Sequence, residues 1–181
     1  MHFTLTDLVT DITQNAVEAG AALVELEIAH NKMPEGGNEF RFLVRDNGKG
    51  MTKEELDRAI DPFVTDGKKH PNRKIGLGLP FLIQTSEISG GGWDIKSEKG
   101  AGTTVTAWFD TGNYDTPPLG DIPGMFRSIL TFGDTAEIII RRKKPDDEYE
   151  IRKSELVDIL GDFEQADTLV LLGEYLRSLE E

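Results

Sequence analysis

Apolar residues change their spacing several times along this chain, from helical to strand-like and back, and this alternation constrains the fold more than any other feature. Spacings of three and four residues predict helices over residues 5–19, 52–60 and 78–89. Alternation at every second residue predicts strands over residues 23–30, 40–46, 93–98 and 103–110. Because no repeat or low-complexity segment interrupts the pattern, we predict an α/β (α+β) fold, a two-layer sandwich in which helices cover a mixed β-sheet.

The first two predicted helices carry start and stop signals at their ends. Thr4 or Thr6 can cap the first helix, and Gly20 follows its last apolar residue. The second helix begins with Thr52 and has Glu55 three residues later, which is the pattern of a capping box. Both helices are therefore predicted from their ends as well as from their periodicity.

The segment over residues 111–120 contains Pro117 and Pro118 and has the composition of a linker or domain boundary. Beyond it the pattern predicts a helix, a strand hairpin and two acidic helices, over residues 122–130, 136–142 with 148–152, 154–160 and 163–179. We therefore expect a main domain over residues 1–112 and a C-terminal extension over residues 113–181. The extension either completes the fold of the main domain or forms a docking or oligomerisation surface.

Composition excludes several kinds of site. The chain has no cysteine, so it can form neither a disulfide nor a thiolate metal site, and the separation of His2, His30 and His70 disfavours a zinc site. The N-terminus lacks the basic region and apolar run of a secretory signal, and no apolar stretch approaches the ~20 residues of a membrane span. We expect a cytoplasmic protein with no membrane partner.

The charge is unevenly distributed. The formal net charge is −13, and residues 145–181 contain twelve acidic against three basic side chains. Such a field repels phosphate backbones, so nucleic acid is not an expected partner. The basic run over residues 141–144 is interpreted as a solvated hairpin end, because the turn residues Pro145, Asp146 and Asp147 follow directly.

Asn15 is anomalous within the first predicted helix. At ~100° per residue it falls about 20° from Leu8 and about 60° from Ile12, at the edge of the apolar face. A partly buried amide needs polar partners. Asp11 lies one turn earlier on the same side, so both side chains can approach a common point. An internal hydrogen bond at the helix flank is the structural alternative.

The sequence DNGKGM over residues 46–51 leaves a predicted strand and turns at once into a capped helix. An ordinary strand-to-helix turn accounts for Gly48 and Gly50. In the functional interpretation, Asp46 accepts a hydrogen bond from an exocyclic amine, the glycines let a flat ring approach the backbone, and Met51 covers it. A carboxylate at this point favours adenine over guanine, which presents a carbonyl there.

The sequence KIGLGLPFL over residues 74–82 places Gly76 and Gly78 at the start of a helix, where free amides and the helix dipole attract phosphate. Four cations lie in the irregular stretch before these glycines, at Lys68, Lys69, Arg73 and Lys74. They either close over a triphosphate as a lid or are solvated loop charges. In the hairpin turn GAGTTV, Thr103 can direct its hydroxyl toward the same site.

Together these motifs resemble those of the Bergerat-fold (GHKL, histidine-kinase-like) ATPases. This superfamily groups DNA gyrase, the large cytosolic heat-shock chaperone, mismatch-repair ATPases, sensor histidine kinases and the anti-sigma-factor serine kinases. The resemblance covers roughly residues 5–110. It comprises an N box, a first glycine box, a phenylalanine box and two further glycine boxes, over residues 11–21, 46–51, 61–70, 74–82 and 90–109. It implies a Bergerat ATP-binding fold for residues 1–112.

The resemblance also implies roles for single residues. Asn15 would hold magnesium, Asp46 and Gly50 would recognise adenine, Thr103 would assist that contact, and residues 76–78 would bind phosphate. The remaining residues of the implied nucleotide site are Glu18, Gly48, Met51, Lys68, Lys69, Lys74, Leu77 and Leu79. The predicted catalytic residue is Asp11, which stands where gyrase and mismatch-repair relatives have a glutamate. Its side chain is one methylene shorter, so hydrolysis is expected to be slow.

The GLGL sequence and the phenylalanine box favour the histidine kinase and anti-sigma-factor kinase branch. The chain begins at the N-box helix, without dimerisation helices to carry a phosphoacceptor histidine, so autophosphorylation is not expected. We predict a stand-alone Mg-ATP-binding protein of signalling or regulation that transfers phosphoryl groups to a partner protein or hydrolyses ATP slowly. The alternative is a non-catalytic, ATP-gated interaction module. A fragment of a DNA-processing ATPase is disfavoured by the acidic charge and the lack of a transducer domain.

Overall fold

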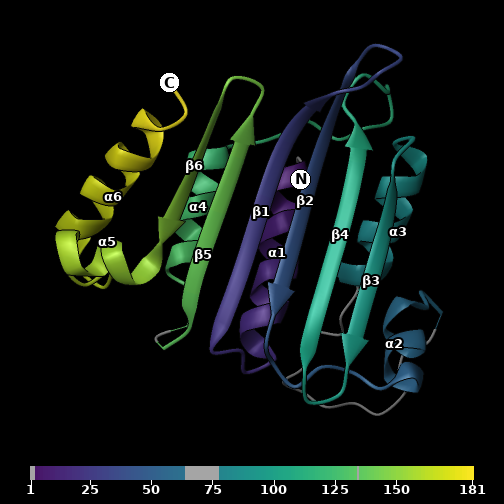
Figure 1. Ribbon diagram of the computed structural model, residues 1–181, viewed down its shortest axis with the longest axis horizontal. Coiled ribbons are helices and arrows are strands. Elements are labelled where there is room, and N and C mark those ends of the chain that lie inside the picture. Colours follow the sequence, from purple (N-terminus) through teal and green to yellow (C-terminus); the bar gives the residue numbers. More distant parts are fainter. Residues whose placement is uncertain (1–2, 64–77, 134) are drawn as a thin grey trace.

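The computed structural model describes residues 3–63, 78–133 and 135–181. In this part of the chain the strands are β1 (Leu23–Lys32), β2 (Asn38–Asp46), β3 (Gly92–Glu98), β4 (Gly102–Asp110), β5 (Glu137–Lys144) and β6 (Asp147–Arg152). The helices are α1 (Leu5–Glu18), α2 (Lys53–Ile60), α3 (Gly78–Ile88), α4 (Ile122–Leu130), α5 (Lys153–Leu160) and α6 (Ala166–Ser178). Figure 1 shows the strands side by side in one sheet.

The sheet is mixed, and helices cover one of its faces. Its strand order is β3-β4-β2-β1-β5-β6, and the β1–β5 pair is parallel whereas the other neighbouring pairs are antiparallel. In Figure 1, α1, α3 and α4 lie behind the sheet, and α5 and α6 lie beyond β6. The predicted two-layer α/β class is therefore confirmed.

The core lies between the sheet and these helices. In β1, Val24, Leu26 and Ile28 are completely buried and alternate with more exposed residues, as the two-residue period requires. Leu8 and Val9 of α1 are equally buried. The apolar alternation that predicted the strands is thus the pattern by which they bury one face under the helices.

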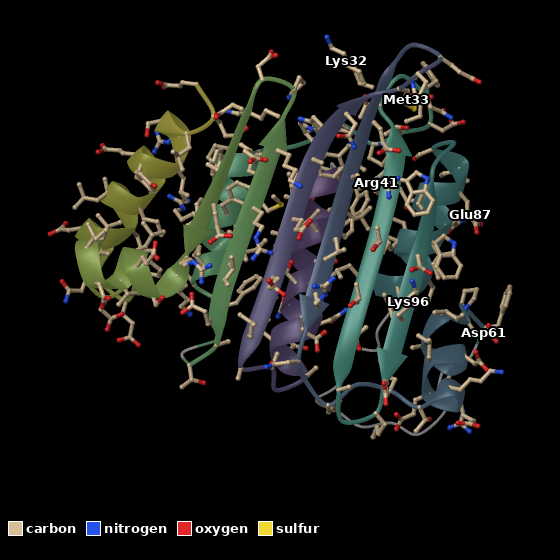
Figure 2. All side chains as sticks on the ribbon, viewed as in Figure 1. Lys32, Met33, Arg41, Asp61, Glu87 and Lys96 are labelled. Carbon is tan, nitrogen blue, oxygen red and sulfur yellow. The ribbon has the colours of Figure 1, made fainter. Side chains whose placement is uncertain are left out.

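The opposite face of the sheet is polar and carries the alternate residues of each strand. Arg41 of β2 and Lys96 of β3 lie on it (Figure 2). The Arg41 guanidinium lies 4.6 Å from the centre of the Trp108 ring. Arg141 of β5 forms ion pairs with carboxylates on both neighbouring strands, Glu25 at 3.0 Å and Glu150 at 2.7 Å. Charged side chains thus cover this face without a helix layer.

The N-terminal helix begins as its capping signal predicts. The Thr4 hydroxyl accepts a hydrogen bond from the Asp7 backbone N–H at 3.2 Å, and the Asp7 carboxylate accepts one from the Thr4 N–H at 2.9 Å. Thr4, and not Thr6, is therefore the N-cap. Gly20 follows the helix with a φ of +76°, which glycine adopts without strain. The Thr52–Glu55 capping box of α2 is confirmed in the same way.

The segment after β4 runs back along the N-terminus. Backbone N–H groups of Leu5 and Thr6 donate to the carbonyls of Pro118 and Leu119 at 2.9 and 3.0 Å. Further on, β5 pairs with β1 in the main sheet, and α4 packs on α1. Residues 113–181 therefore contribute strands and helices to the same two layers. The division into a main domain over residues 1–112 and an extension over residues 113–181 stays a prediction.

The last helix differs from its prediction. It begins at Ala166 and not at Phe163, which is buried before the helix starts. The reason is an aspartate turn, because the Asp162 carboxylate accepts from the Glu164 N–H at 3.0 Å and its carbonyl accepts from Gln165. No helix within the described residues is both long and apolar enough to cross a bilayer.

Candidate functional site

A cavity of about 500 Å³ opens between α1 and the ends of β2 and β4 where these two strands pair. Its lining residues are Ile12, Asn15, Ala16, Glu18, Ala19, Val44, Asp46, Lys49, Gly50, Met51, Ala59, Leu79, Thr103 and Val105. Most of the walls are therefore apolar, with a small number of polar groups among them. This composition is typical of small-molecule sites, whose volumes run from about 300 to 1,000 Å³.

Asp46 is the buried charge of this cavity. It is the last residue of β2 and is only 8% exposed. One carboxylate oxygen accepts a hydrogen bond from the Gly48 N–H at 2.8 Å. Burial raises the pKa of the Asp46 carboxyl above its usual value, and hydrogen bonds from the Gly48 and Thr103 backbones act in the opposite direction. The cavity thus contains a fixed acceptor that is costly to keep charged in the absence of a further donor.

Two glycines allow the segment after Asp46 to lie against the β3–β4 turn. Gly50 has a φ of +59°, and a Cβ there would collide with the carbonyl oxygen of Glu98. Gly102 has a φ of +115°, and a Cβ there would collide with the carbonyl oxygen of Asp46. Both positions need glycine for contacts within the protein. These two close approaches hold the walls of the cavity together.

Ser97 joins these two walls, and sequence reasoning missed it. Its hydroxyl oxygen accepts a hydrogen bond from the Met51 N–H at 2.8 Å and lies 2.8 Å from the Thr103 hydroxyl and 3.2 Å from the Gly102 carbonyl oxygen. Ser97 does not line the cavity, so no ligand-based motif identifies it. The sequence feature that could have identified Ser97 is its position opposite Thr103 in the predicted hairpin.

On α1, Asn15 and Glu18 line the cavity. Asn15 is exposed, so the expectation of a partly buried amide was wrong; the side chain borders the open cavity and not a packed neighbour. The start of α3 lies beside it, since a Cβ on Gly78 would be 3.5 Å from the Asn15 side-chain nitrogen. Glu18 accepts a hydrogen bond from the Gln14 amide at 2.9 Å. Asp11 is exposed on the same helix and is not a lining residue.

The structure therefore brings part of the predicted site together. The predicted residues that line the cavity are Asn15, Glu18, Asp46, Gly50, Met51, Leu79 and Thr103. Gly48 lies behind the lining, where a Cβ would be 2.8 Å from the Ala19 carbonyl oxygen. Lys68, Lys69, Lys74, Gly76 and Leu77 lie outside the described residues. The ligand roles of all these residues stay predictions.

Several lining residues were not predicted to be part of the site. The apolar ones are Ile12, Ala16, Ala19, Val44, Ala59 and Val105. Most belong to the apolar faces that predicted the elements, so their pattern does not distinguish a cavity wall from packed core. Lys49 is exposed and also lines the cavity. Its backbone fixes the turn, because its N–H donates to Ala19 at 3.0 Å and its carbonyl accepts from Gly100 at 2.7 Å.

Fold and cavity together define a two-layer α/β structure with a cavity between its first helix and the sheet. Residues 3–113 match the family described as histidine kinase-, DNA gyrase B- and HSP90-like ATPase. The chain belongs to this family, and its two-layer arrangement is that of the Bergerat ATPase fold.

Relatives of known description include two classes of protein. The chain is 27% identical over 116 residues to the sensor histidine kinase ZraS of Escherichia coli, an alignment that covers 64% of this chain and 23% of the kinase. It is 36% identical over 73 residues to the DNA mismatch repair protein MutL of Thermus aquaticus, which covers 40% of this chain and 13% of MutL. The chain thus spans less than a quarter of the length of either relative.

A third relative is the methanogenesis regulatory histidine kinase FilI of Methanothrix harundinacea, 32% identical over 100 residues, with 55% of this chain and 11% of the kinase covered. Among solved structures, the N-terminal domain of a DNA repair protein superposes with a TM-score of 0.47 at 12% identity, over 82% of this chain and 51% of that one.

Proposed function

We propose that the chain binds Mg-ATP in the cavity beside α1, with the adenine ring between the apolar walls and its amino group on Asp46. The observation that supports this most directly is the buried Asp46 carboxylate, an acceptor 8% exposed at the wall of a slot of about 500 Å³. An amine donor from the ligand would satisfy this carboxylate and offset the cost of its burial. Family membership supplies the nucleotide as the expected ligand.

Magnesium would be held by Asn15 together with the phosphates of the nucleotide. Among the described residues, no group of three or more His, Asp or Glu side chains is placed to hold a metal ion. Mg²⁺ keeps several waters and is often bound through one or two protein oxygens plus substrate phosphates, so a single amide is a suitable donor set. The start of α3 at Gly78 lies beside Asn15, where helix amides attract phosphate.

The proposed chemistry is phosphoryl transfer to a separate regulatory protein or slow hydrolysis. In this proposal Asp11 orients the attacking hydroxyl or water, and Lys68, Lys69 and Lys74 balance the charge that develops on the γ-phosphate. Asp11 lies one turn before Asn15 on α1 and exposes its side chain to solvent. An attacking group that arrives from outside the cavity would meet it there.

The second candidate function is a non-catalytic module in which ATP regulates a protein contact. One observation favours it, namely that Asp11 is absent from the cavity lining whereas Asn15 and Asp46 are part of it. The cavity would then contain Asn15 and Asp46 to bind ATP but not Asp11, the residue predicted to be catalytic. In this function, differential affinity of ATP for two states of the protein drives the change.

Calorimetric titration tests the binding step. We expect ATP and ADP to bind with magnesium present, GTP to bind much more weakly, and chelation of magnesium to weaken ATP more than ADP. Equal affinity for ATP and GTP would contradict the adenine assignment. Asp94→Asn, on the polar sheet face, is a matched control that should bind ATP like the wild type.

Turnover separates the two functions. If the chain is an enzyme, Asp11→Asn should lower phosphate release or transfer from γ-labelled ATP by a large factor while ATP affinity changes little. Turnover equal to that of the wild type would remove Asp11 from the mechanism. ATP-dependent complex formation with no labelled protein and no released phosphate would favour the module.

A further inference from the structure

A second hollow, separate from the nucleotide cavity, lies where α4 and α6 pack together. Its volume is about 290 Å³, and its lining residues are Asp121, Pro123, Gly124, Arg127, Gly173 and Arg177. The hollow therefore combines the first turn of α4 with two arginines, one from each helix. Figure 1 shows α4 behind the sheet and α6 outside β6, away from α2 and the β3–β4 turn.

The two arginines converge on one point. The Nη1 atom of Arg127 and the Nη2 atom of Arg177 each lie 3.5 Å from the position that a Cβ on Gly173 would occupy. Two like charges that approach the same position repel each other, and an anion bound there would offset this repulsion. The two guanidinium groups therefore both lie next to Gly173 on α6.

These arginines lack carboxylate partners within the part of the chain that the structure describes. None of the ion pairs among those residues includes Arg127 or Arg177. The Arg177 Nε donates a hydrogen bond to the Gly173 carbonyl at 3.1 Å, which leaves the other guanidinium donors for a ligand. Both arginines are exposed, so a ligand from solvent can reach them.

Asp121 is the acidic residue among those that line this hollow, against two arginines. Its carboxylate accepts the Gly124 N–H at 3.0 Å and caps α4, where the positive end of the helix dipole stabilises it. The two guanidinium groups therefore exceed the local negative charge. Arginine pairs of this kind bind phosphate oxygens in a bidentate manner.

Gly173 provides the space between the two arginines. It lies inside α6, where glycine is less favourable than alanine by about 0.5 to 1 kcal/mol. Packing does not require it, because an added Cβ would make only ordinary contacts, the nearest at 3.5 Å. A methyl group there would occupy the space between the two guanidinium groups.

We propose that this hollow is an anion site that binds a phosphate group through Arg127 and Arg177. The phosphate is either free or carried on a phosphorylated side chain of a partner protein. The site shares no lining residue with the nucleotide cavity. Because all of its lining residues lie within residues 113–181, the C-terminal extension would bind a ligand different from the nucleotide.

The test is titration of the whole chain with inorganic phosphate and with a phosphoserine peptide, at ionic strength held constant with chloride. We expect saturable binding, with chemical-shift changes at the Gly124 and Gly173 amides. Arg127→Gln and Arg177→Gln should each weaken binding about tenfold or more, whereas Arg45→Gln on the polar sheet face should not change it. Tighter binding of the peptide than of phosphate would identify a protein-borne group, and the reverse would identify a free one.

Gly173→Ala separates the site from a structural role. Alanine should raise the melting temperature without phosphate, because it favours the helix, and should still weaken phosphate binding. The proposal is overturned if millimolar phosphate gives no saturable binding, or if it acts equally on the wild type and on the Arg127, Arg177 and Arg45 variants.

Discussion

At the scale of single residues, Asp46 is expected to cost stability in the ligand-free protein. Its pKa in the folded state is raised above the usual value of 3.8, so the folded chain binds this proton more tightly than the unfolded chain does. Stability therefore falls as pH rises from 3.8 through the raised pKa, and the full cost remains at neutral pH.

Asp46→Asn removes this charge while its amide oxygen can still accept from the Gly48 N–H. We expect the ligand-free variant to be at least as stable as the wild type at pH 7 by urea denaturation. We expect ATP affinity to fall about 10- to 100-fold, the value of a hydrogen bond to a charged group, by calorimetry. A variant that binds ATP like the wild type would remove Asp46 from the ligand contact.

Ser97→Ala tests whether the two cavity walls are joined through one hydroxyl. The change leaves the Met51 N–H and the Thr103 hydroxyl without their partner. We expect a loss of about 1 kcal/mol in the free energy of unfolding, with weaker ATP binding, because the segment over residues 47–51 loses a tether. Ser154→Ala on α5 is the matched control. Equal effects of the two changes would show that Ser97 does not position the wall.

The residue scale also shows why the site was only partly predictable. Asp46, Met51 and Thr103 lie next to turns, and Asn15 is a polar residue at the edge of the apolar face of α1. The structure places all four around one cavity. Ser97 depends on the register of the β3–β4 pair, which brings it opposite Thr103. The register of two paired strands depends on tertiary packing, so the sequence pattern alone does not predict it reliably.

At the scale of elements, α6 is held to the sheet by a buried charge cluster. Arg142 of β5 is 2% exposed and donates to Glu180 at 3.1 Å, to the Lys143 carbonyl at 2.8 Å and to His30 Nδ1 at 3.1 Å. The Tyr149 hydroxyl donates to the same Glu180 carboxylate. Glu180 follows α6, so this cluster fixes the end of the helix on β5 and β6.

Glu180→Gln should therefore destabilise the chain strongly. The buried Arg142 would keep its charge without a counter-ion, which costs on the order of 3 kcal/mol when a buried pair is broken. Glu181→Gln is the matched control, because Glu181 is exposed. Urea denaturation of both variants checks the prediction, and similar midpoints would show that the cluster does not stabilise the fold.

His30 makes the same cluster sensitive to pH. Burial and the Arg142 guanidinium lower the pKa of His30 below 6.5, and Glu180 acts in the opposite direction. The unfolded chain then binds more protons than the folded one, so stability is present above pH 6.5 and is lost as pH falls below it toward the lowered pKa. We expect His30→Gln to flatten this loss in a series of denaturation curves between pH 7.5 and pH 5.5, roughly one unit either side of 6.5. If the variant lost stability with falling pH as steeply as the wild type, His30 would not be the cause of that loss.

Elements were predicted best where local signals agree. α4 has the predicted bounds, because Asp121 caps it and its apolar residues recur at helical spacing. α6 begins three residues later than predicted, since the Asp162 turn competes with the helix for the backbone of residues 163–165. A local hydrogen bond from an aspartate thus decided one boundary that apolar periodicity did not.

At the scale of the whole molecule, the sequence predicted the class of fold but not the place of the C-terminal part. The parallel pairing of β1 with β5 joins residues 23–29 to residues 137–143 across more than one hundred positions. Such a contact depends on which strand edge is left open after β2 pairs, and no spacing along the chain encodes it. The proline-bearing segment over residues 111–120 has linker composition, yet its carbonyls accept from the N-terminal helix.

A chain cut after residue 112 tests how far the N-terminal part is independent. The cut removes β5, and with it the backbone partners of β1 over residues 23–29. It also removes α4, whose Phe126 and Ile129 are completely buried, so apolar surface of α1 and an open strand edge would face water. Exposed edges and apolar patches of this kind promote association.

We therefore expect the 1–112 fragment to aggregate or to lack dispersed amide signals, and to bind no ATP by calorimetry. A cut after Leu160 is the graded control, because it removes α6 and Glu180 but keeps the six described strands. That fragment should lose stability and still fold. If instead the 1–112 fragment were monomeric, folded and able to bind ATP, residues 1–112 would be sufficient for the nucleotide site. In that case β5 and α4 would not be needed for the fold of the N-terminal part.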